Sequence, residues 1–266
     1  MIRSYFGIEQ LPFSAEDITL LPHQQEVYDI LKVHSQQGGL CLLLGEPGTG
    51  KSIIKGELKR NADKHMVVVT VSRTLHTDSN MIKVLCEAFN IEYSGTHFKC
   101  ERRLIDEALS LYRNGKLLVI IIDDAHLMEM QTLRRLRLLL EDFPKNHNLI
   151  LVGQNELLSH MSLKINEDLK GRVTYSVIMK KLVYDDMTAF ILAQLDKAGL
   201  GHNLFTEEAL PLIVRSADGL LRRARNLCLS CMLEAVRDRK KTIDLQIVNR
   251  VLIQPHWRLD SELEPS

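Results

Sequence analysis

Short apolar runs alternate with helix-patterned segments through the first two thirds of the chain. The runs are too short for an ordinary helix and rich in Val, Ile or Leu, which is typical of strands buried on both faces of a parallel sheet. Strands are predicted at 39–44, 66–71, 117–122, 149–152 and 173–179. Helices are predicted between them, among others at 52–61, 81–89, 102–112 and 130–142. This alternation predicts an α/β sandwich with right-handed crossovers.

Beyond about residue 182 the pattern becomes purely helical. Helices are predicted at 185–198, 206–216, 220–237 and 242–253, with no strand between them. Thr206 and Thr242 each precede a helical run and suit N-caps. We therefore expect an αβα domain over residues 1–181, an all-helical domain over 182–255 and a polar tail over 256–266.

Composition narrows the class of protein only slightly. Lys plus Arg equal Asp plus Glu at 34 each, so net charge gives no argument for a nucleic-acid or membrane-surface partner. Any such binding has to come from a local patch. The chain has no secretory leader pattern and no apolar run of about 18 residues. We expect a soluble cytoplasmic protein without a membrane segment.

The cysteines indicate reduced thiols. Five are scattered through apolar segments, an odd number that does not suit a disulfide framework. Cys228 and Cys231 form a CxxC, but no second CxxC or His pair stands at zinc-ligand spacing. Buried core thiols are favoured over a metal or redox role.

The segment GEPGTGKS follows the first predicted strand and opens a predicted helix. It matches G-x-x-x-x-G-K-[ST], a phosphate-binding loop, in the context that the motif requires. Its backbone N–H groups are expected to face phosphate oxygens, with Lys51 on the β and γ phosphates and the Ser52 hydroxyl on Mg²⁺. The alternative is a Gly-rich turn with an incidental Lys. The residues expected to bind nucleotide here are Gly45, Glu46, Pro47, Gly48, Thr49, Gly50, Lys51 and Ser52.

A second candidate element is LLVIIIDDAH at 117–126, an apolar strand that ends in acidic residues. We expect it beside the first strand, with Asp123 as the magnesium ligand. Asp124 follows where many ATPases carry a Glu that polarises the attacking water, and its shorter side chain leaves that role open. The alternative is a pair of surface carboxylates.

Several pieces of sequence together resemble the AAA+ ATPases of the ExeA (general secretion pathway protein A) type, which are related to the TniB and TnsC transposition ATPases. The resemblance covers roughly residues 1–250. In order along the chain it is carried by YFGIEQLPFS, LPHQQEVYDIL, GEPGTGKS, IIDDAH, LVGQNEL, LKGRV, LFTEEAL and GLLRRARNLC. Two features depart from the family pattern. Where the family usually has Asp-Glu, this chain has Asp123-Asp124, and the lid reads GLLRR where the commoner form is GxPR.

The resemblance implies a P-loop NTPase αβα core with a parallel five-stranded sheet and a C-terminal helical lid. It implies an ATP-hydrolysing enzyme that uses ATP and Mg²⁺ and forms a ring or filament with ATP at subunit junctions. By position in the motifs it also implies site residues. These are an adenine pocket formed partly around Pro12, Phe13 and His23, the sensor-1 residue Gln154, the arginine finger Arg172 and the sensor-2 residue Arg222.

Two uses of such an ATPase compete. One is an ATP-dependent DNA-binding regulator of transposition, with duplex DNA and a transposase as partners. The other is a secretion-system assembly ATPase or another AAA+ switch. The chain ends at Ser266 with neither a membrane segment nor a cell-wall-binding part, which favours the DNA use. Basic clusters add to it, although such residues are also common on solvated faces; they are Arg134, Arg135 and Arg137, and Arg222, Arg223, Arg225, Arg237, Arg239, Lys240 and Lys241.

Overall fold

The computed structural model describes residues 1–14, 20–71 and 78–257. The chain forms two compact units. The helical unit comprises the described residues of Met1–Thr19, Pro47–Thr49 and Lys180–Ser266, and the sheet unit those of Leu20–Glu46 and Gly50–Met179. The change near residue 180 agrees with the change of pattern in the sequence. The N-terminal segment groups with the helices, whereas the predicted division had assigned it to the αβα domain.

The sheet unit is built on five parallel strands in the order β2-β3-β4-β1-β5. Each strand lies at a predicted position, within one residue at either end. The expectation that the strand before Asp123 lies beside the first strand is wrong, because β4 separates β3 from β1. The strands are β1 (Gly39–Leu44), β2 (Met66–Val71), β3 (Leu117–Ile122), β4 (Asn148–Gly153) and β5 (Val173–Ile178).

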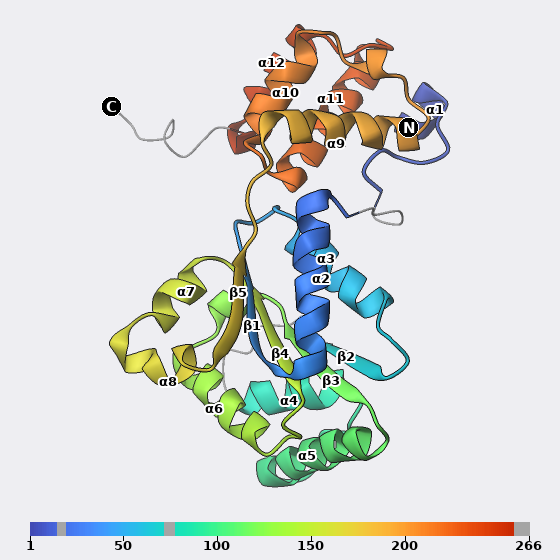
Figure 1. Ribbon diagram of the computed structural model, residues 1–266. Helices are drawn as coiled ribbons and strands as arrows, with labels where there is room; N and C mark the ends of the chain where they lie inside the picture. The colour runs from blue at the N-terminus through green and yellow to red at the C-terminus, as the bar shows by residue number, and fades with distance from the viewer. Residues whose placement is uncertain (15–19, 72–77, 258–266) are drawn as a thin grey trace. The chain divides into compact units, whose positions relative to one another are not determined.

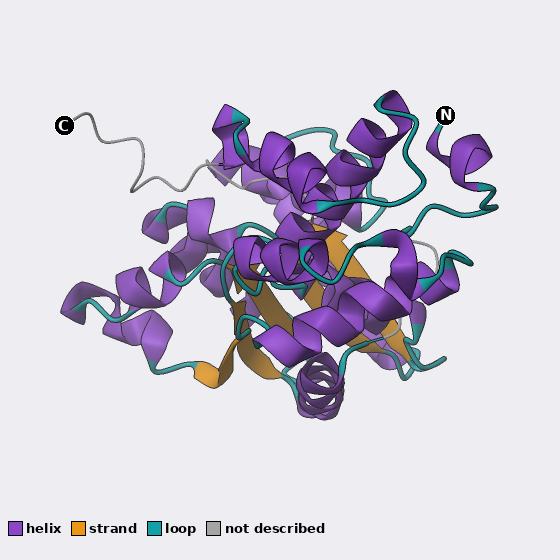
Figure 2. Ribbon diagram, turned by 90° about the horizontal axis from the view of Figure 1, so that it is seen from above, coloured by secondary structure: helices purple, strands orange, loops and turns teal. Residues whose placement is uncertain are grey.

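Helices cover both faces of this sheet (Figures 1 and 2). Alternate side chains of a strand point to opposite faces, so Leu42 and Leu44 of β1 join one core cluster while Cys41 and Leu43 join another. The first cluster includes residues of α4, α5 and α6, and the second includes residues of α2 and α3. The helices of the sheet unit are α2 (Pro22–Gln37), α3 (Lys51–Arg60), α4 (Asp78–Ala88), α5 (His97–Arg113), α6 (Met130–Glu141), α7 (Glu156–Met161) and α8 (Glu167–Lys170), with short turns η1 (Ala125–Leu127) and η2 (Lys164–Asn166).

The helical unit packs its own apolar core. Thr206 accepts a hydrogen bond from the Ala209 N–H at 3.3 Å, but the N-cap of the helix that begins at Ala209 is Glu208, not Thr206. The Thr242 cap is wrong, because Asp244 caps the last long helix and accepts from the Ile247 N–H at 3.0 Å. The helices are α1 (Ile2–Phe6), α9 (Tyr184–Lys197), α10 (Ala209–Ala217), α11 (Leu221–Arg237) and α12 (Leu245–Leu252), with η3 (His202–Leu204) and η4 (Pro255–Trp257). Within the described ranges, no helix has the length and apolarity that crossing a membrane requires.

The CxxC of α11 belongs to this core. Cys228 and Cys231 are free thiols that are fully buried. Burial raises the pKa of the Cys231 thiol to about 12 and also raises that of Cys228. Because the thiolate is the form that binds metal and attacks disulfides, these residues are inert packing groups, as the sequence favoured.

The N-terminal segment contributes directly to the helical core. Phe13 is 6% exposed and its ring centroid lies 5.7 Å from that of Phe190. Its backbone N–H donates to Gln194 Oε1 at 3.2 Å. Nearer the start, the Lys241 ammonium lies 4.1 Å from the centroid of the Tyr5 ring. Residues 1–14 are therefore part of the helical unit and not a free arm.

We predict that Phe13→Ala destabilises the helical unit by about 3–5 kcal/mol, since it removes a buried aromatic side chain. Trp257, the single tryptophan, lies in the core of the same unit, so its fluorescence during urea unfolding reports on that unit. The matched control is Phe98→Ala, because Phe98 is 71% exposed on α5. Equal unfolding midpoints for the two variants would contradict the placement of Phe13.

Candidate functional site

Three strand ends meet at the carboxyl edge of the sheet. Leu44 of β1 stands in register with Gly153 of β4, and Ile122 of β3 with Leu151 of β4. The residues that follow these strands, Gly45, Gln154 and Asp123, therefore start from the same edge. In open parallel sheets, ligands bind in the crevice outside this edge.

The loop of residues 45–52 connects β1 to α3. Gly50 has φ 103° and is the N-cap of α3, a conformation that favours glycine. Lys51 is the first helical residue, and its Nζ turns back to donate to Gly45 O at 2.6 Å and Glu46 O at 2.8 Å. An ammonium and the N–H groups of a helix start thus border the same loop, an arrangement that binds phosphate.

Asp123 is held by contacts on both of its carboxylate oxygens. Its Oδ1 accepts the Asp124 N–H at 3.1 Å, and its Oδ2 accepts a charge-assisted bond from Lys55 Nζ. Its own N–H donates to Val71 O of β2 at 3.0 Å. Lys55 is a residue that the sequence analysis missed. The available signal was its position four residues after Lys51, which places both on neighbouring turns of one helix face.

Asp124 differs from its neighbour in conformation and exposure. It has φ 51° and ψ 34°, the left-handed region, which Asp tolerates better than most residues. It precedes η1 and is exposed, whereas Asp123 is partly buried. The two carboxylates therefore do not share one environment, and different roles for them are physically reasonable.

Gln154 lies just past β4, where the sequence placed it, and pairs with a second residue that the sequence analysis missed. Its Nε2 lies 2.8 Å from Nε2 of His126, in η1. The approach is close because position 153 is Gly: a Cβ there would stand 3.1 Å from the His126 backbone nitrogen. This contact ties the loop after β3 to the end of β4. In the sequence, His126 appears in the IIDDAH motif, but nothing there indicates that it contacts Gln154.

Arg172 stands at the other end of the sheet. It directly precedes β5, whose first residue pairs with Leu40 near the amino end of β1. Its guanidinium lies 2.8 Å from Glu141 Oε1, an oxygen that Arg137 also contacts at 2.7 Å. The Arg172 side chain is 53% exposed and that of Glu141 is 42% exposed. Within its own sheet unit Arg172 is thus remote from the carboxyl edge.

The other predicted site residues lie in different parts of the chain. Arg222 is exposed at the start of α11 in the helical unit, and its backbone N–H donates to Gly48 O of the 45–52 loop at 3.3 Å. Phe13 belongs to the core of that unit, with Pro12 beside it, and His23 lies in the first turn of α2 in the sheet unit. Their part in nucleotide binding stays a prediction.

The oxygen donors of the site suit Mg²⁺. Asp123 offers a carboxylate and Ser52 a hydroxyl, both hard ligands. Among the described residues, no group of three or more His, Cys, Asp or Glu could hold a metal ion by itself. Two oxygen ligands of this kind are enough for Mg²⁺, which usually completes its coordination with phosphate oxygens and water.

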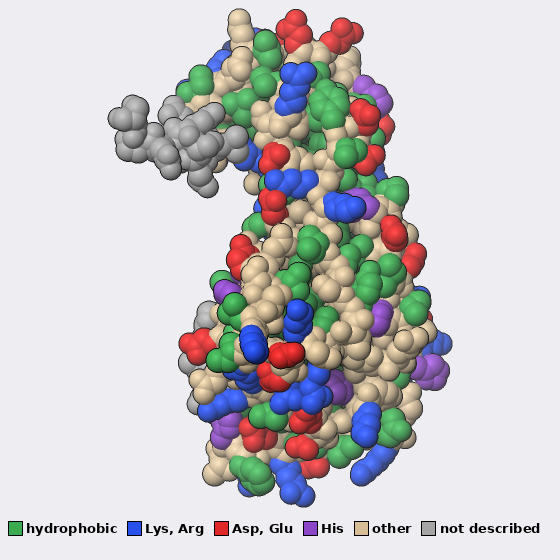
Figure 3. Space-filling view, turned by 60° about the vertical axis from the view of Figure 1, so that its left-hand side comes forward, with side chains coloured by type: hydrophobic (Ala, Val, Ile, Leu, Met, Phe, Trp, Pro, Cys, Tyr) green, Lys and Arg blue, Asp and Glu red, His purple; other side chains and the backbone are tan. Residues whose placement is uncertain are grey.

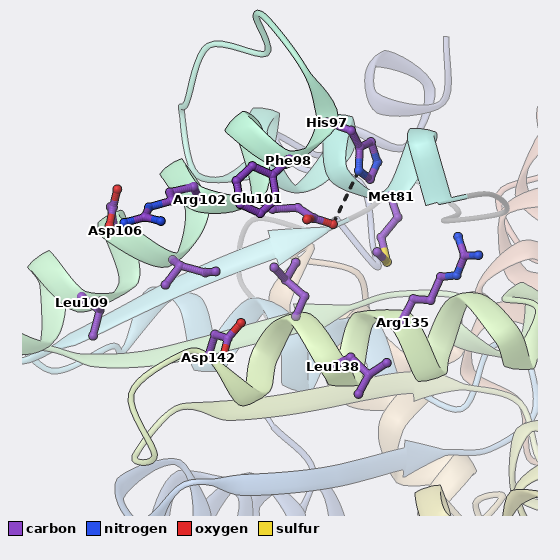
Figure 4. A pocket seen from close by; sticks show the side chains of 12 residues that line it. Met81, His97, Phe98, Glu101, Arg102, Asp106, Leu109, Arg135, Leu138 and Asp142 are labelled. Carbon is purple, nitrogen blue, oxygen red and sulfur yellow. Dashed lines mark ion pairs between the residues drawn. The ribbon is translucent and has the colours of Figure 1, made fainter.

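A cavity of about 810 Å³ lies elsewhere on the sheet unit, lined by residues of α4, α5 and α6 (Figure 4). Arg135 stands at it together with the exposed Phe98 and Leu138, and His97 pairs with Glu101 at 3.5 Å. Basic and acidic groups alternate along its walls. It contains none of the predicted nucleotide-site residues.

Comparisons with known proteins agree with this geometry. Residues 33–161 match the family described as AAA domain. The chain is 26% identical over 238 residues to general secretion pathway protein A of Aeromonas hydrophila. Over these stretches the chain is similar to AAA+ proteins of the ExeA type. The alignment covers 86% of the chain but 44% of that relative, so the chain spans less than half the relative's length.

Solved AAA+ structures share the fold. Cdc6p of Pyrobaculum aerophilum has a TM-score of 0.70 at 17% identity, with 91% of this chain and 68% of that one covered. ORC1 of Aeropyrum pernix, in complex with DNA, has a TM-score of 0.68 at 17% identity, covering 93% and 68%. The RuvB branch migration motor of Thermotoga maritima has a TM-score of 0.57 at 18% identity, covering 91% and 71%. The fold and the family resemblance are thereby confirmed, and the individual roles of Gln154, Arg172 and Arg222 stay predictions.

Proposed function

We propose that this AAA+ protein binds ATP and hydrolyses it with Mg²⁺. The observation that carries the proposal is the register of β1, β3 and β4, which brings the phosphate loop, Asp123 and Gln154 to one edge of the sheet. A phosphate-binding loop alone would support nucleotide binding. The acidic pair beside it adds the groups that hydrolysis needs.

The residues divide into roles by their chemistry. The N–H groups of the loop and the Lys51 ammonium bind the phosphates, and Ser52 and Asp123 would hold the metal. Mg²⁺, when bound, neutralises phosphate charge. Asp124, exposed at the same edge, orients and polarises the attacking water. Gln154, whose Nε2 contacts His126, would donate a hydrogen bond to the γ-phosphate.

We also propose that Arg172 acts on the ATP of a neighbouring copy. Six residues of β5 separate it from the carboxyl edge, which at about 3.3 Å per residue is a span of about 20 Å. Its pair with Glu141 is half-exposed, and such pairs contribute at most about 1 kcal/mol. The guanidinium can therefore leave Glu141 for a phosphate at low cost.

For the process served, we propose ATP-dependent DNA binding in the regulation of transposition. Support comes from the TniB and TnsC resemblance and from a protein of the same fold, Aeropyrum ORC1, whose solved structure is a complex with DNA. The competing proposal is an assembly role like that implied by the name of the secretion relative. The cytoplasmic location expected from the sequence stays a prediction.

The pairing of surface cations within the chain limits how the protein would bind DNA. Several cations of both predicted clusters are paired within the chain: Arg134 donates to Asn166 Oδ1 at 2.6 Å and Lys240 to Asp244 at 2.6 Å. Arg225 and Arg239 are exposed. Blue and red side chains are interspersed on the face shown in Figure 3. Because several of the clustered cations already have partners within the chain, we propose that DNA binding is collective, with several ATP-bound copies on one duplex.

Lys51→Ala is predicted to weaken binding of a fluorescent ATP analogue at least about tenfold without lowering the unfolding midpoint, because Lys51 supplies charge to the phosphates and little packing. The matched control is Lys59→Ala, on an exposed position two turns along α3. Unchanged affinity in Lys51→Ala would contradict the proposed phosphate site.

Asp123→Asn should abolish Mg²⁺-dependent turnover, and Asp124→Asn should slow turnover while binding is retained.

Mixing Arg172→Ala protein with Lys51→Ala protein is predicted to restore part of the ATP turnover, since mixed junctions combine an intact loop with an intact finger. An arginine finger contributes about 10³–10⁵ in rate in other NTPases, so even a few such junctions are measurable. The control mixes Arg172→Ala with the Lys51→Ala/Arg172→Ala double variant, which offers no intact finger. Recovery in neither mixture, with mixed oligomers verified, would count against action in trans.

ATP-loaded protein is predicted to retain duplex DNA at low salt with little sequence preference, and to lose it steeply as salt rises, because each neutralised phosphate releases counterions. Arg225→Gln/Arg239→Gln should reduce the salt slope and leave ATP binding intact. Arg215→Gln, exposed on α10 outside both clusters, serves as control. No retention at low ionic strength would favour the assembly role.

A further inference from the structure

Among the described residues, Lys55 is the side chain that pairs with Asp123, and the proposed function does not use it. It lies in α3, one turn beyond Lys51, and its ammonium donates to Oδ2 of Asp123, the residue that follows β3. The Lys55 side chain is 18% exposed and that of Asp123 is 20% exposed. The contact is thus an ion pair largely removed from water, next to the phosphate loop.

This partial burial sets the energetics of the pair. An exposed pair contributes little, whereas removing one partner of a pair that is largely shielded from water leaves a charge without compensation and is more costly. Asp123 Oδ1 is already occupied by the Asp124 N–H at 3.1 Å, so Lys55 supplies the only full positive charge that an ion pair or hydrogen bond of the described residues brings to this carboxylate. A divalent cation brought to the same carboxylate meets that ammonium at short range and is repelled by it.

We propose that Lys55 is a tethered competitor of Mg²⁺ for Asp123. The inference rests on the proposed function, in which Asp123 is a metal ligand. Without metal, the ammonium neutralises Asp123 and lowers the repulsion between this carboxylate and the phosphates of a nucleotide. With metal, it has to swing away from Oδ2, which its long, flexible side chain permits. Lys55 therefore weakens the coupling between Mg²⁺ and nucleotide binding.

The test measures that coupling by binding, without turnover. The quantity is the ratio of two dissociation constants for a fluorescent ATP analogue, the value in EDTA divided by the value in Mg²⁺. In Lys55→Met the unpaired Asp123 weakens binding in EDTA, and loss of the competitor strengthens binding in Mg²⁺. We expect the ratio to rise at least about tenfold above wild type, since both effects act in the same direction.

Two further variants separate charge from shape. Lys55→Gln keeps a hydrogen-bond donor but removes the charge, and should raise the ratio as Lys55→Met does. Lys59→Met removes a lysine from an exposed position on the same helix and should leave the ratio at the wild-type value. Without nucleotide, Lys55→Met should also show a lower melting temperature than wild type in EDTA. Adding Asp123→Asn should recover part of that loss, because no buried charge is then left unpaired.

The outcomes distinguish this inference from the proposed function. If wild type fails to bind the analogue, or binds it equally with and without Mg²⁺, the proposed metal-dependent nucleotide site is contradicted. If wild type shows a Mg²⁺ effect and the ratio is the same in Lys55→Met, Lys55→Gln and Lys59→Met, the competitor role is overturned. Unfolding of both Lys55 variants with and without Mg²⁺ would assign Lys55 a purely structural role and overturn it as well.

Discussion

The register of the parallel sheet is the constraint on which the site depends. Parallel pairing turns every strand in the same direction, so whatever follows a strand emerges at one edge. Leu44 opposite Gly153 puts the start of the loop level with Gln154, and Ile122 opposite Leu151 puts Asp123 about two residues before that level. A slip of one residue in any pairing would exchange the two faces of that strand, which are buried against different helices. The core that stabilises the sheet thereby also fixes the geometry of the site.

The buried charges near that edge follow from the same constraint. β3 is buried on both faces and ends at Ile122. The carboxylate of Asp123, which follows it, needs a partner because an unpaired charge in a partly buried position is unfavourable. α3 crosses from β1 on the side of the second core cluster, where Ile54 and Leu58 pack against the sheet. Lys55, adjacent to Ile54, is thereby brought to Asp123. The packing of α3 against the sheet and the neutralisation of Asp123 are therefore coupled. A substitution that shifts α3 should also change the Lys55–Asp123 contact.

Much of the fold was predictable because its signals are local. The five strands are apolar runs whose ends are marked by Gly, Asp or charged residues, and the loop motif fixes its own conformation through glycine. The lateral order of strands was mispredicted, since hydrophobic periodicity records which faces are buried and not which strand is the neighbour. Lys55 and His126 were missed for a related reason, because each acquires its partner only in the folded sheet. His126 meets Gln154 where β3 and β4 are neighbours, and Lys55 of α3 meets Asp123 although β4 separates β1 from β3. Phe13 was associated with the nucleotide through family resemblance, while its packing partner Phe190 stands far along the chain.

The position of Arg172 has a consequence for assembly. A guanidinium at the amino end of an edge strand cannot serve the carboxyl edge of its own sheet, yet its pattern of contacts is loose: one shared carboxylate oxygen and half of the side chain in solvent. Glu141 would still be contacted by Arg137 if Arg172 turned away, so no unpaired charge would result. That redundancy keeps the cost of releasing Arg172 small. In the proposed role in trans, such a residue would move to a neighbouring copy's phosphates when ATP is present and return when it is not, which would make subunit contact itself dependent on nucleotide.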